Sequence, residues 1–178
     1  MTNKTVIIMA HPDLDDSVLN ITIKKELETN ENIVYKDLMS LYGDFNIDVK
    51  KEQEDLKDAK KIVFQFPMYW YSSPALLKHY VDEVFSYDFA YKVDEKGFQA
   101  LALRHKEFQL IVTMGSREES FSGEGRLSVK ECLNSHSYTA KMLGMKELKP
   151  CFFYGAIFDF YTENDFRKMK QILKENIL

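Results

Sequence analysis

The sequence predicts an α/β protein with a doubly wound, five-stranded parallel sheet and helices on both faces. Short apolar runs alternate along the chain with segments whose apolar residues recur at helical spacing, which is typical of repeated strand–helix–strand units. The apolar runs lack a polar face, as expected of strands that helices cover on both sides. Because crossovers between parallel strands are right-handed, few topologies remain.

Five segments are predicted to be strands. The run at 33–38 is shorter and more polar than the others, which favours an edge position. We expect the strand order 2-1-3-4-5, which places the carboxyl ends of the first and third strands side by side at the switch point of the sheet. In chain order the predicted strands are 6–10, 33–38, 62–66, 108–113 and 151–154.

Helices are expected in the connections. The stretch 42–56 shows no clear periodicity, so we expect a long connection with a helical start near Lys50. Residues 87–104 carry scattered aromatic side chains between polar ones and are expected to form an excursion over the surface. Helical spacing of apolar residues predicts three further helices, at 17–28, at 129–143 before Gly144, and at 166–177.

The most informative stretch is 62–74, where a buried strand leads into a loop rich in aromatic residues and then into a helix start. Pro67 ends the strand because it lacks an N–H donor, Ser73 is a natural N-cap, and Pro74 suits the first helical position. The loop 68–71 contains the only tryptophan of the chain. Ligands of open α/β sheets bind at the carboxyl ends of strands, so this loop predicts one wall of a pocket for a flat ligand. The alternative is a hydrophobic plug that closes the sheet end.

Composition indicates an ordinary globular protein. The 178 residues fit one domain, expected to span 1–178, with 45% hydrophobic and 29% charged residues. The net charge of −4 argues against binding to nucleic acid or anionic membrane. With no apolar segment long enough for membrane insertion and no signal peptide, we expect a cytoplasmic protein. Cys132 and Cys151 are too few for a disulfide framework or a zinc site and are expected to be core thiols.

The loop 10–20 leads into a helix amino terminus, whose unpaired N–H groups and partial positive charge suit a phosphate. Ser17 adds a hydroxyl, Asn20 an amide and His11 an imidazole. Neither the dinucleotide fingerprint nor the P-loop motif is present. The three aspartates of this loop would repel a phosphate, although Asp16 or Ser17 can instead cap the helix. A purely structural role for His11 is a further alternative.

Three motifs together resemble the flavodoxin-like NAD(P)H:quinone oxidoreductases. They follow one another in the expected order and span nearly the whole chain. The nearest resemblance is to small bacterial members, which include ancillary subunits of glutathione-gated potassium efflux systems. The motifs are 10–12 with Ser17 and Asn20, then 64–72 with Pro74, Leu77 and Lys78, then 85–87 with 89–91.

The resemblance implies a flavin that takes hydride from NADH or NADPH and passes it to a quinone or similar flat acceptor in a ping-pong scheme. FMN is favoured over FAD, because small bacterial members commonly use FMN. The resemblance also implies a homodimer, with Phe89 and Tyr91 as contributors to the partner's site; the alternative is a monomer that buries these two side chains against its own core. The residues implied at the phosphate end are His11, Ser17, Val18 and Asn20.

At the ring end, the resemblance implies that the backbone N–H groups of Trp70 and Tyr71 face the reactive edge of the flavin, so these two residues are the candidate catalytic positions. The wall of the ring pocket would be formed by Pro67, Met68, Tyr69, Trp70 and Tyr71. The loop approaching the pyrimidine end would be Thr113, Met114, Gly115 and Ser116, with Phe121 beyond it.

The chain also departs from the family pattern. Met114 and Ser116 replace a threonine and a glycine, Phe121 has no hydroxyl, and Leu127 stands where mammalian members place a histidine. The tyrosine–histidine pair that steadies charge on the reduced flavin is therefore absent, and backbone dipoles would have to replace it.

Two other classes of function are open. Residues 11–16 superficially resemble the His-Pro-Asp-Asp zinc motif of sugar deacetylases, but Leu14 breaks the spacing and no later histidine pair offers a third ligand, so no metal is expected. A non-catalytic flavoprotein is the second class, either an electron carrier or a regulatory subunit docked on a potassium efflux transporter.

Overall fold

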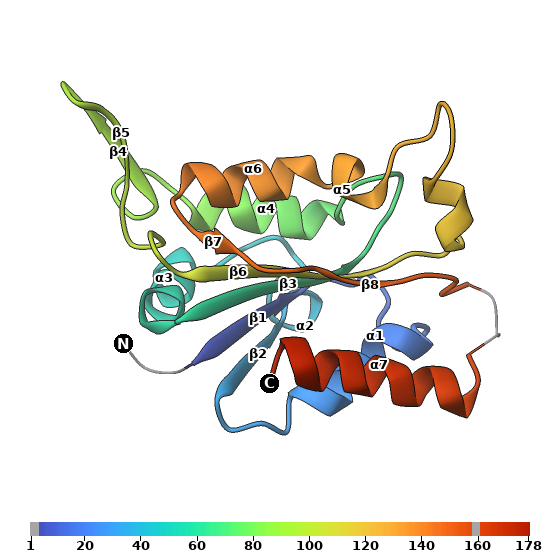
Figure 1. Ribbon diagram of the computed structural model, residues 1–178. Coiled ribbons are helices and arrows are strands. Elements are labelled where there is room, and N and C mark those ends of the chain that lie inside the picture. Colours follow the sequence, from blue (N-terminus) through green and yellow to red (C-terminus); the bar gives the residue numbers. More distant parts are fainter. Residues whose placement is uncertain (1–3, 158–160) are drawn as a thin grey trace.

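A computed structural model of the chain describes residues 4–157 and 161–178 (Figure 1). One parallel sheet has the order β2-β1-β3-β6, with β7 and β8 both paired to the far side of β6. The predicted order 2-1-3-4-5 is confirmed, and β2 lies at the expected edge. The strands are β1 (Thr5–Met9), β2 (Ile33–Asp37), β3 (Lys61–Pro67), β6 (Glu107–Thr113), β7 (Lys146–Glu147) and β8 (Cys151–Phe153).

Helices cover both faces of this sheet, with α4 and α6 on one face and α1 and α7 on the other (Figure 1). The helices are α1 (Val18–Leu27), α2 (Leu38–Tyr42), α3 (Val49–Asp58), α4 (Ala75–Val84), α5 (Val129–Cys132), α6 (Asn134–Met142) and α7 (Glu163–Asn176), with a 3₁₀ turn η1 (Glu118–Phe121). Every residue of β3 is buried. Because side chains alternate along a strand, Phe64 and Phe66 enter the core under α4, while Val63 enters the core under α1 and α7.

Several element boundaries differ from the sequence predictions, including the start of α7, which lies three residues before the predicted one. Pro74, not Ser73, occupies the N-cap of α4, because its ψ of 149° is extended and its carbonyl accepts the N–H of Leu77 at 3.0 Å. The predicted helix 129–143 is divided into α5 and α6 by Leu133. The stretch after β2 contains the short helix α2 before the connection, and α3 begins at Val49, close to the expected start near Lys50.

The excursion predicted at 87–104 is an antiparallel ribbon of β4 (Tyr91–Asp94) and β5 (Gly97–Ala100) that projects from the body (Figure 1). It follows α4, which returns the chain from the carboxyl end of β3 to the amino end of β6, so the ribbon lies at the amino edge of the sheet. Phe89 and Tyr91 are half-buried against the core of their own chain. The exposed apolar side chains of the ribbon region are Tyr87, Val93 and Phe98.

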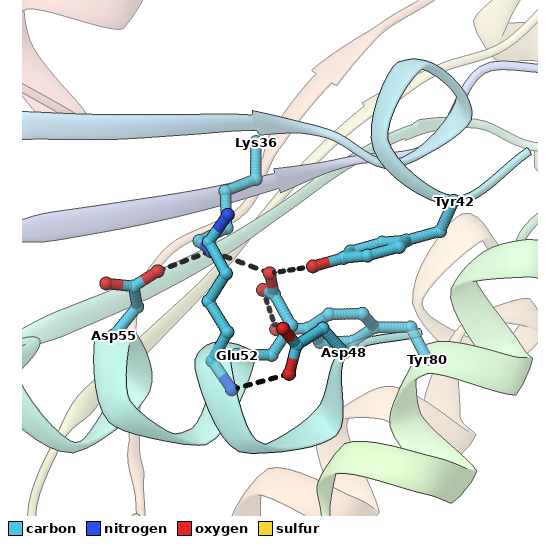
Figure 2. Close-up of polar contacts among 7 residues, drawn as sticks. Lys36, Tyr42, Asp48, Glu52, Asp55 and Tyr80 are labelled. Atoms are coloured by element: carbon cyan, nitrogen blue, oxygen red, sulfur yellow. Dashed lines mark hydrogen bonds and ion pairs between the residues drawn. The ribbon is translucent and has the colours of Figure 1, made fainter. Parts of the chain in front are cut away.

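A buried carboxylate joins four elements below the β2 edge (Figure 2). Glu52 of α3 is 0% exposed and accepts hydrogen bonds from Lys36 of β2 at 2.8 Å, Tyr42 of α2 at 2.7 Å and Tyr80 of α4 at 3.0 Å. Burial and the nearby Glu52 charge hold the pKa of the Tyr80 hydroxyl well above its usual range. Lys36 also pairs with Asp55, which is partly exposed. The charge of Glu52 is therefore matched by one cation and two hydroxyl donors.

Another buried ionisable group, His136 of α6, lies on the same face of the sheet. Its ring packs against Phe64 and Phe66, with centroids 5.9 and 5.4 Å away. Burial, with a smaller effect from the charge of Lys78, lowers the pKa of His136 to about 4. The folded protein therefore holds this imidazole neutral at pH 7.

Replacing Glu52 with alanine is expected to lower the free energy of unfolding by about 3–5 kcal/mol, because Lys36 and two tyrosine hydroxyls lose a buried acceptor. Urea unfolding followed by circular dichroism measures this change. Asp55→Ala is the matched control, since it removes the partly exposed partner of the same lysine and should cost less than about 1 kcal/mol. Equal losses in the two variants would contradict this account of the cluster.

His136 is expected to make the protein less stable in acid. An unfolded histidine binds a proton below pH 6.5, whereas folded His136 stays neutral until about pH 4, so acid favours unfolding across that window. Between pH 7 and pH 5 this group should remove about 2 kcal/mol from the free energy of unfolding. Urea titrations of the wild type and His136→Phe at both pH values test this; the variant should lose that much less stability. An identical pH dependence of the two proteins would show that His136 does not carry it.

Candidate functional site

The site lies at the carboxyl edge of the sheet, where three strand ends are level. In the parallel register Met9 pairs with Gln65 and Pro67 pairs with Thr113. The N–H of Met68 donates to the carbonyl of Thr113 at 2.8 Å, and so ties the loop after β3 to the end of β6. The loops after β1, β3 and β6 therefore meet, as the sequence predicts.

A first depression, of about 450 Å³, lies over the amino terminus of α1. Ser17 is the N-cap of this helix and accepts the N–H of Asn20 at 3.3 Å, which is the capping role proposed as an alternative for it. Val18 follows as the first helical residue and is exposed. The lining residues are His11, Asp13, Asp16, Ser17, Val18, Asn20, Pro67, Met68, Tyr69, Thr113, Gly115, Ala156 and Ile157.

His11 is a neutral donor at this depression. Its Nδ1 accepts the N–H of Asp13 at 3.1 Å, so the ring proton lies on Nε2. Burial lowers the pKa of His11 below its ordinary value of 6.5, and the nearby Asp13 charge opposes that effect only in part. The imidazole is therefore uncharged at pH 7 and can donate one hydrogen bond to a ligand.

A second depression, of about 370 Å³, adjoins the first and shares Met68, Gly115 and Ile157 with it. Each residue predicted for the site within one chain lines one depression or the other. Phe89 and Tyr91, expected to contribute across a homodimer, line neither depression, and Leu127 also lines neither and is exposed. The lining residues of the second depression are Met68, Trp70, Tyr71, Met114, Gly115, Ser116, Phe121 and Ile157.

The aromatic loop is a tight two-residue turn. Tyr69 and Ser72 exchange both backbone hydrogen bonds, at 2.9 and 3.0 Å. Between them Trp70 has φ 45° and Tyr71 has φ 66°, as such turns require, and this conformation is unfavourable for side chains of this size. In the described part of the chain the N–H groups of Trp70 and Tyr71 have no acceptor, so both are available to a ligand.

Trp70 does not close the sheet end. Its side chain is 92% exposed, and Tyr69 and Tyr71 are also exposed. A plug would instead have buried these rings against the strands. The structure therefore disfavours the hydrophobic plug, and the exposed aromatic surface stands beside the second depression.

The segment after β8 supplies lining residues that the sequence analysis missed. Met114 donates to Phe153 and accepts from Ala156, both at 2.8 Å. Gly115 lies under Ile157, since a Cβ at position 115 would come within 2.3 Å of Ile157 Cδ1. The position of this segment in the sequence could have placed it at the site, because it also follows the carboxyl end of a predicted strand.

Residues 4–157 and 161–178 contain no group of three or more His, Cys, Asp or Glu side chains that could hold a metal ion. Within the same ranges, no helix combines the length and the apolar character needed to cross a membrane.

Comparison with known proteins gives the family. A family model described as flavodoxin-like fold matches residues 3–177. The chain belongs to the flavodoxin-like family. This flavodoxin-like chain is 40% identical to the uncharacterized NAD(P)H oxidoreductase YrkL of Bacillus subtilis, with 86% of this chain and 87% of YrkL covered. It is 35% identical to the glutathione-regulated potassium-efflux system ancillary protein KefG of Yersinia pestis, with 86% and 82% covered.

Solved structures give the same fold. General stress protein 14 of Treponema denticola, in complex with FMN, has a TM-score of 0.82 and 28% identity, with 97% of this flavodoxin-like chain and 94% of that chain covered. A thermophilic tryptophan halogenase, Th-Hal, from Streptomycin violaceusniger has a TM-score of 0.86 and 35% identity, with 98% of both chains covered. These similarities confirm the family and the fold expected from the motifs.

The strain in the aromatic turn is measurable. Trp70→Gly should raise the free energy of unfolding by about 1 kcal/mol, because glycine adopts a positive φ freely and the exposed indole contributes no packing. Chemical denaturation measures the change. Tyr138→Gly, at an exposed aromatic position of α6, is the control and should lower stability by about 1 kcal/mol. A loss of stability in Trp70→Gly would mean that the turn is not strained.

Proposed function

We propose that this protein is a flavin-dependent oxidoreductase that uses FMN to carry hydride from NADH or NADPH to a quinone or a similar flat acceptor, in a ping-pong sequence. The observation that carries the proposal is the pair of adjoining depressions, one lined by hydrogen-bond donors over a helix amino terminus and one beside an aromatic turn with two free N–H groups. The names of the relatives support it, because YrkL is an NAD(P)H oxidoreductase and the general stress protein 14 structure contains FMN.

The first depression fits the phosphate end of FMN. The first-turn N–H groups of α1, the Ser17 hydroxyl and the Nε2–H of His11 are donors to an anion. Asp13 and Asp16 line the same depression and oppose a phosphate. Neutral and backbone donors therefore have to outweigh two nearby carboxylates.

The second depression fits the ring end. Bound flavin supplies the hydride chemistry, so the chain has to bind, orient and exclude water. The free N–H groups of Trp70 and Tyr71 can hold the ring edge and stabilise negative charge there. No His, Cys, Asp, Glu or Lys is among the described residues that line this depression, so we assign no side chain as general acid or base.

A second copy of the chain is part of the proposal. Exposed apolar residues gather at two ends of the molecule: Tyr87, Val93 and Phe98 at the ribbon, and Trp70 and Tyr71 at the site. Exposed patches of this kind mark interaction surfaces. In a twofold homodimer each ribbon region would cover the ring pocket of the other chain. Phe89 and Tyr91 would support the ribbon from inside its own chain.

The likeness to KefG favours one alternative, a regulatory flavoprotein that docks on a potassium efflux transporter. The flavin pocket of such a regulatory protein would be the same as that of an enzyme. The name of Th-Hal points to a different reaction, but the oxidoreductase names and the FMN complex agree with each other and with the site geometry. Reduction of a flat acceptor is therefore the activity that we propose.

The purified protein should bind FMN in preference to FAD, and anaerobic NADH or NADPH should bleach the bound flavin, with a quinone restoring its colour. Calorimetry and visible absorbance measure these steps. Trp70→Ala should weaken FMN binding or slow turnover while the circular dichroism spectrum stays unchanged. Failure to bind either flavin would refute the proposal. Flavin that binds but that neither nicotinamide reduces would favour the regulatory role.

A further inference from the structure

A buried glutamine lies behind the phosphate end of the site. Gln65 is on the central strand β3 and is 0% exposed. The hydroxyl of Tyr35 donates to its Oε1 at 2.7 Å, and its Nε2 lies 3.3 Å from both the main-chain carbonyl oxygen and the Oδ1 of Asn20. Gln65 lines neither depression, so any effect on a ligand has to pass through Asn20.

One atom fixes the direction of these hydrogen bonds. The main-chain carbonyl of Asn20 can only accept, so the end of Gln65 that faces it must be the NH₂ group. The Asn20 atom that faces the same NH₂ group must then be Oδ1. Both side-chain amides are oriented by this carbonyl, and Tyr35 is left as the donor to the Gln65 oxygen.

The orientation of Asn20 decides the role of two hydroxyls. Its Nδ2 donates to the Oγ1 of Thr113 at 2.9 Å and to the Oγ of Ser17 at 3.1 Å. Ser17 and Thr113 therefore act as acceptors toward Asn20, and across residues 4–157 and 161–178 neither hydroxyl donates to a protein group. Because both residues line the first depression, each retains a proton that it can donate to a ligand there.

We propose that Gln65 is a positioning residue that orients Asn20 so that Ser17 and Thr113 are hydrogen-bond donors to the phosphate of the flavin. This inference rests on the proposed function, since it concerns how FMN is held. The opposite orientation of Asn20 would make both hydroxyls donate to Oδ1 and turn their lone pairs toward the phosphate. With Asp13 and Asp16 already lining this depression, that reversal would leave only His11 and the helix N–H groups as donors to an anion.

Tyr35 secures the far end of this hydrogen-bond series. Burial, followed by the charges of Asp37 and Glu28, raises the pKa of the Tyr35 hydroxyl well above its usual value. The hydroxyl therefore stays protonated and remains a donor to Gln65 across the working pH range. The Asn20 carbonyl and the Tyr35 hydroxyl therefore require the same orientation of the Gln65 amide.

The variant Gln65→Glu should reverse the orientation of the Asn20 amide in a pH-dependent way. Above the pKa of the new carboxyl group, residue 65 can only accept, so the Asn20 amide turns its NH₂ group toward it. Asn20 Oδ1 then accepts hydrogen bonds from the hydroxyls of Ser17 and Thr113. When protonated, the same carboxyl group has one O–H, which can donate to Asn20 Oδ1 and restore its original orientation. Burial raises the pKa of a carboxyl group, which brings this change toward neutral pH.

The measurement is the ratio of dissociation constants for riboflavin and FMN, because the two differ only in the phosphate. Calorimetric titrations use wild type and Gln65→Glu at pH 5.5 and pH 8.5. At pH 8.5 the preference of the variant for FMN over riboflavin should be at least about tenfold weaker than that of wild type, with riboflavin affinity unchanged. At pH 5.5 most of the wild-type preference should return. Comparison with wild type at each pH removes the titration of the FMN phosphate itself.

Gln109→Glu is the matched control. Gln109 is also buried in a central strand, and its Nε2 donates to the carbonyl of Lys149, far from Asn20 in the sheet. This variant should lose stability without changing the FMN preference. Gln65→Met leaves Asn20 Oδ1 without its donor and should lower the preference at both pH values, so it tests the proposal even if Gln65→Glu does not fold.

A folded Gln65→Glu protein with the wild-type ratio at both pH values would overturn the inference while leaving the proposed function intact. The same holds if wild type binds riboflavin as tightly as FMN. Wild type that binds neither ligand would instead remove the proposed function, and the role of Gln65 with it.

Discussion

The register of β3 between β1 and β6 is the constraint on which the rest of the structure depends. All seven residues of β3 are buried, and the strand is paired on both sides. A slip by one residue would move Gln65 into the apolar core that holds Phe64 and would remove it from Asn20. The same slip would separate Pro67 from Thr113, so the loops that form the two depressions would no longer be level.

The groups that can bind a ligand in this site are mostly backbone N–H groups and neutral side chains. His11 is uncharged, Ser17 and Thr113 are oriented through Asn20, and the aromatic turn offers N–H groups from a strained conformation. Strain of this kind persists only where surrounding structure holds it. Here the ends of the turn are held by β3 and α4, and α4 is held in turn by Tyr80 and the buried Glu52. Stability at the β2 edge and geometry at the site are thus linked through one helix.

The sequence predicts most of the fold because burial leaves a local signature, as the apolar runs of β1, β3 and β6 show. Boundaries that depend on one dihedral angle were less predictable, as with the N-cap at Pro74 and the break at Leu133. The site residues after β1, β3 and β6 could be placed because each follows a predicted strand. Gln65 could not, since its partners lie 30 and 45 positions away in the chain and a single polar residue in an apolar run gives no sign of them.

The position of the single tryptophan has a practical consequence. An indole that is 92% exposed in the folded protein has nearly the same solvent environment as in the unfolded chain. Its emission should therefore change little when a single chain unfolds and should respond strongly when a flat, light-absorbing ligand, or the ribbon of a second copy, lies beside it. Trp70 is in effect a built-in optical probe of what covers the site, and it responds only weakly to the unfolding of a single chain.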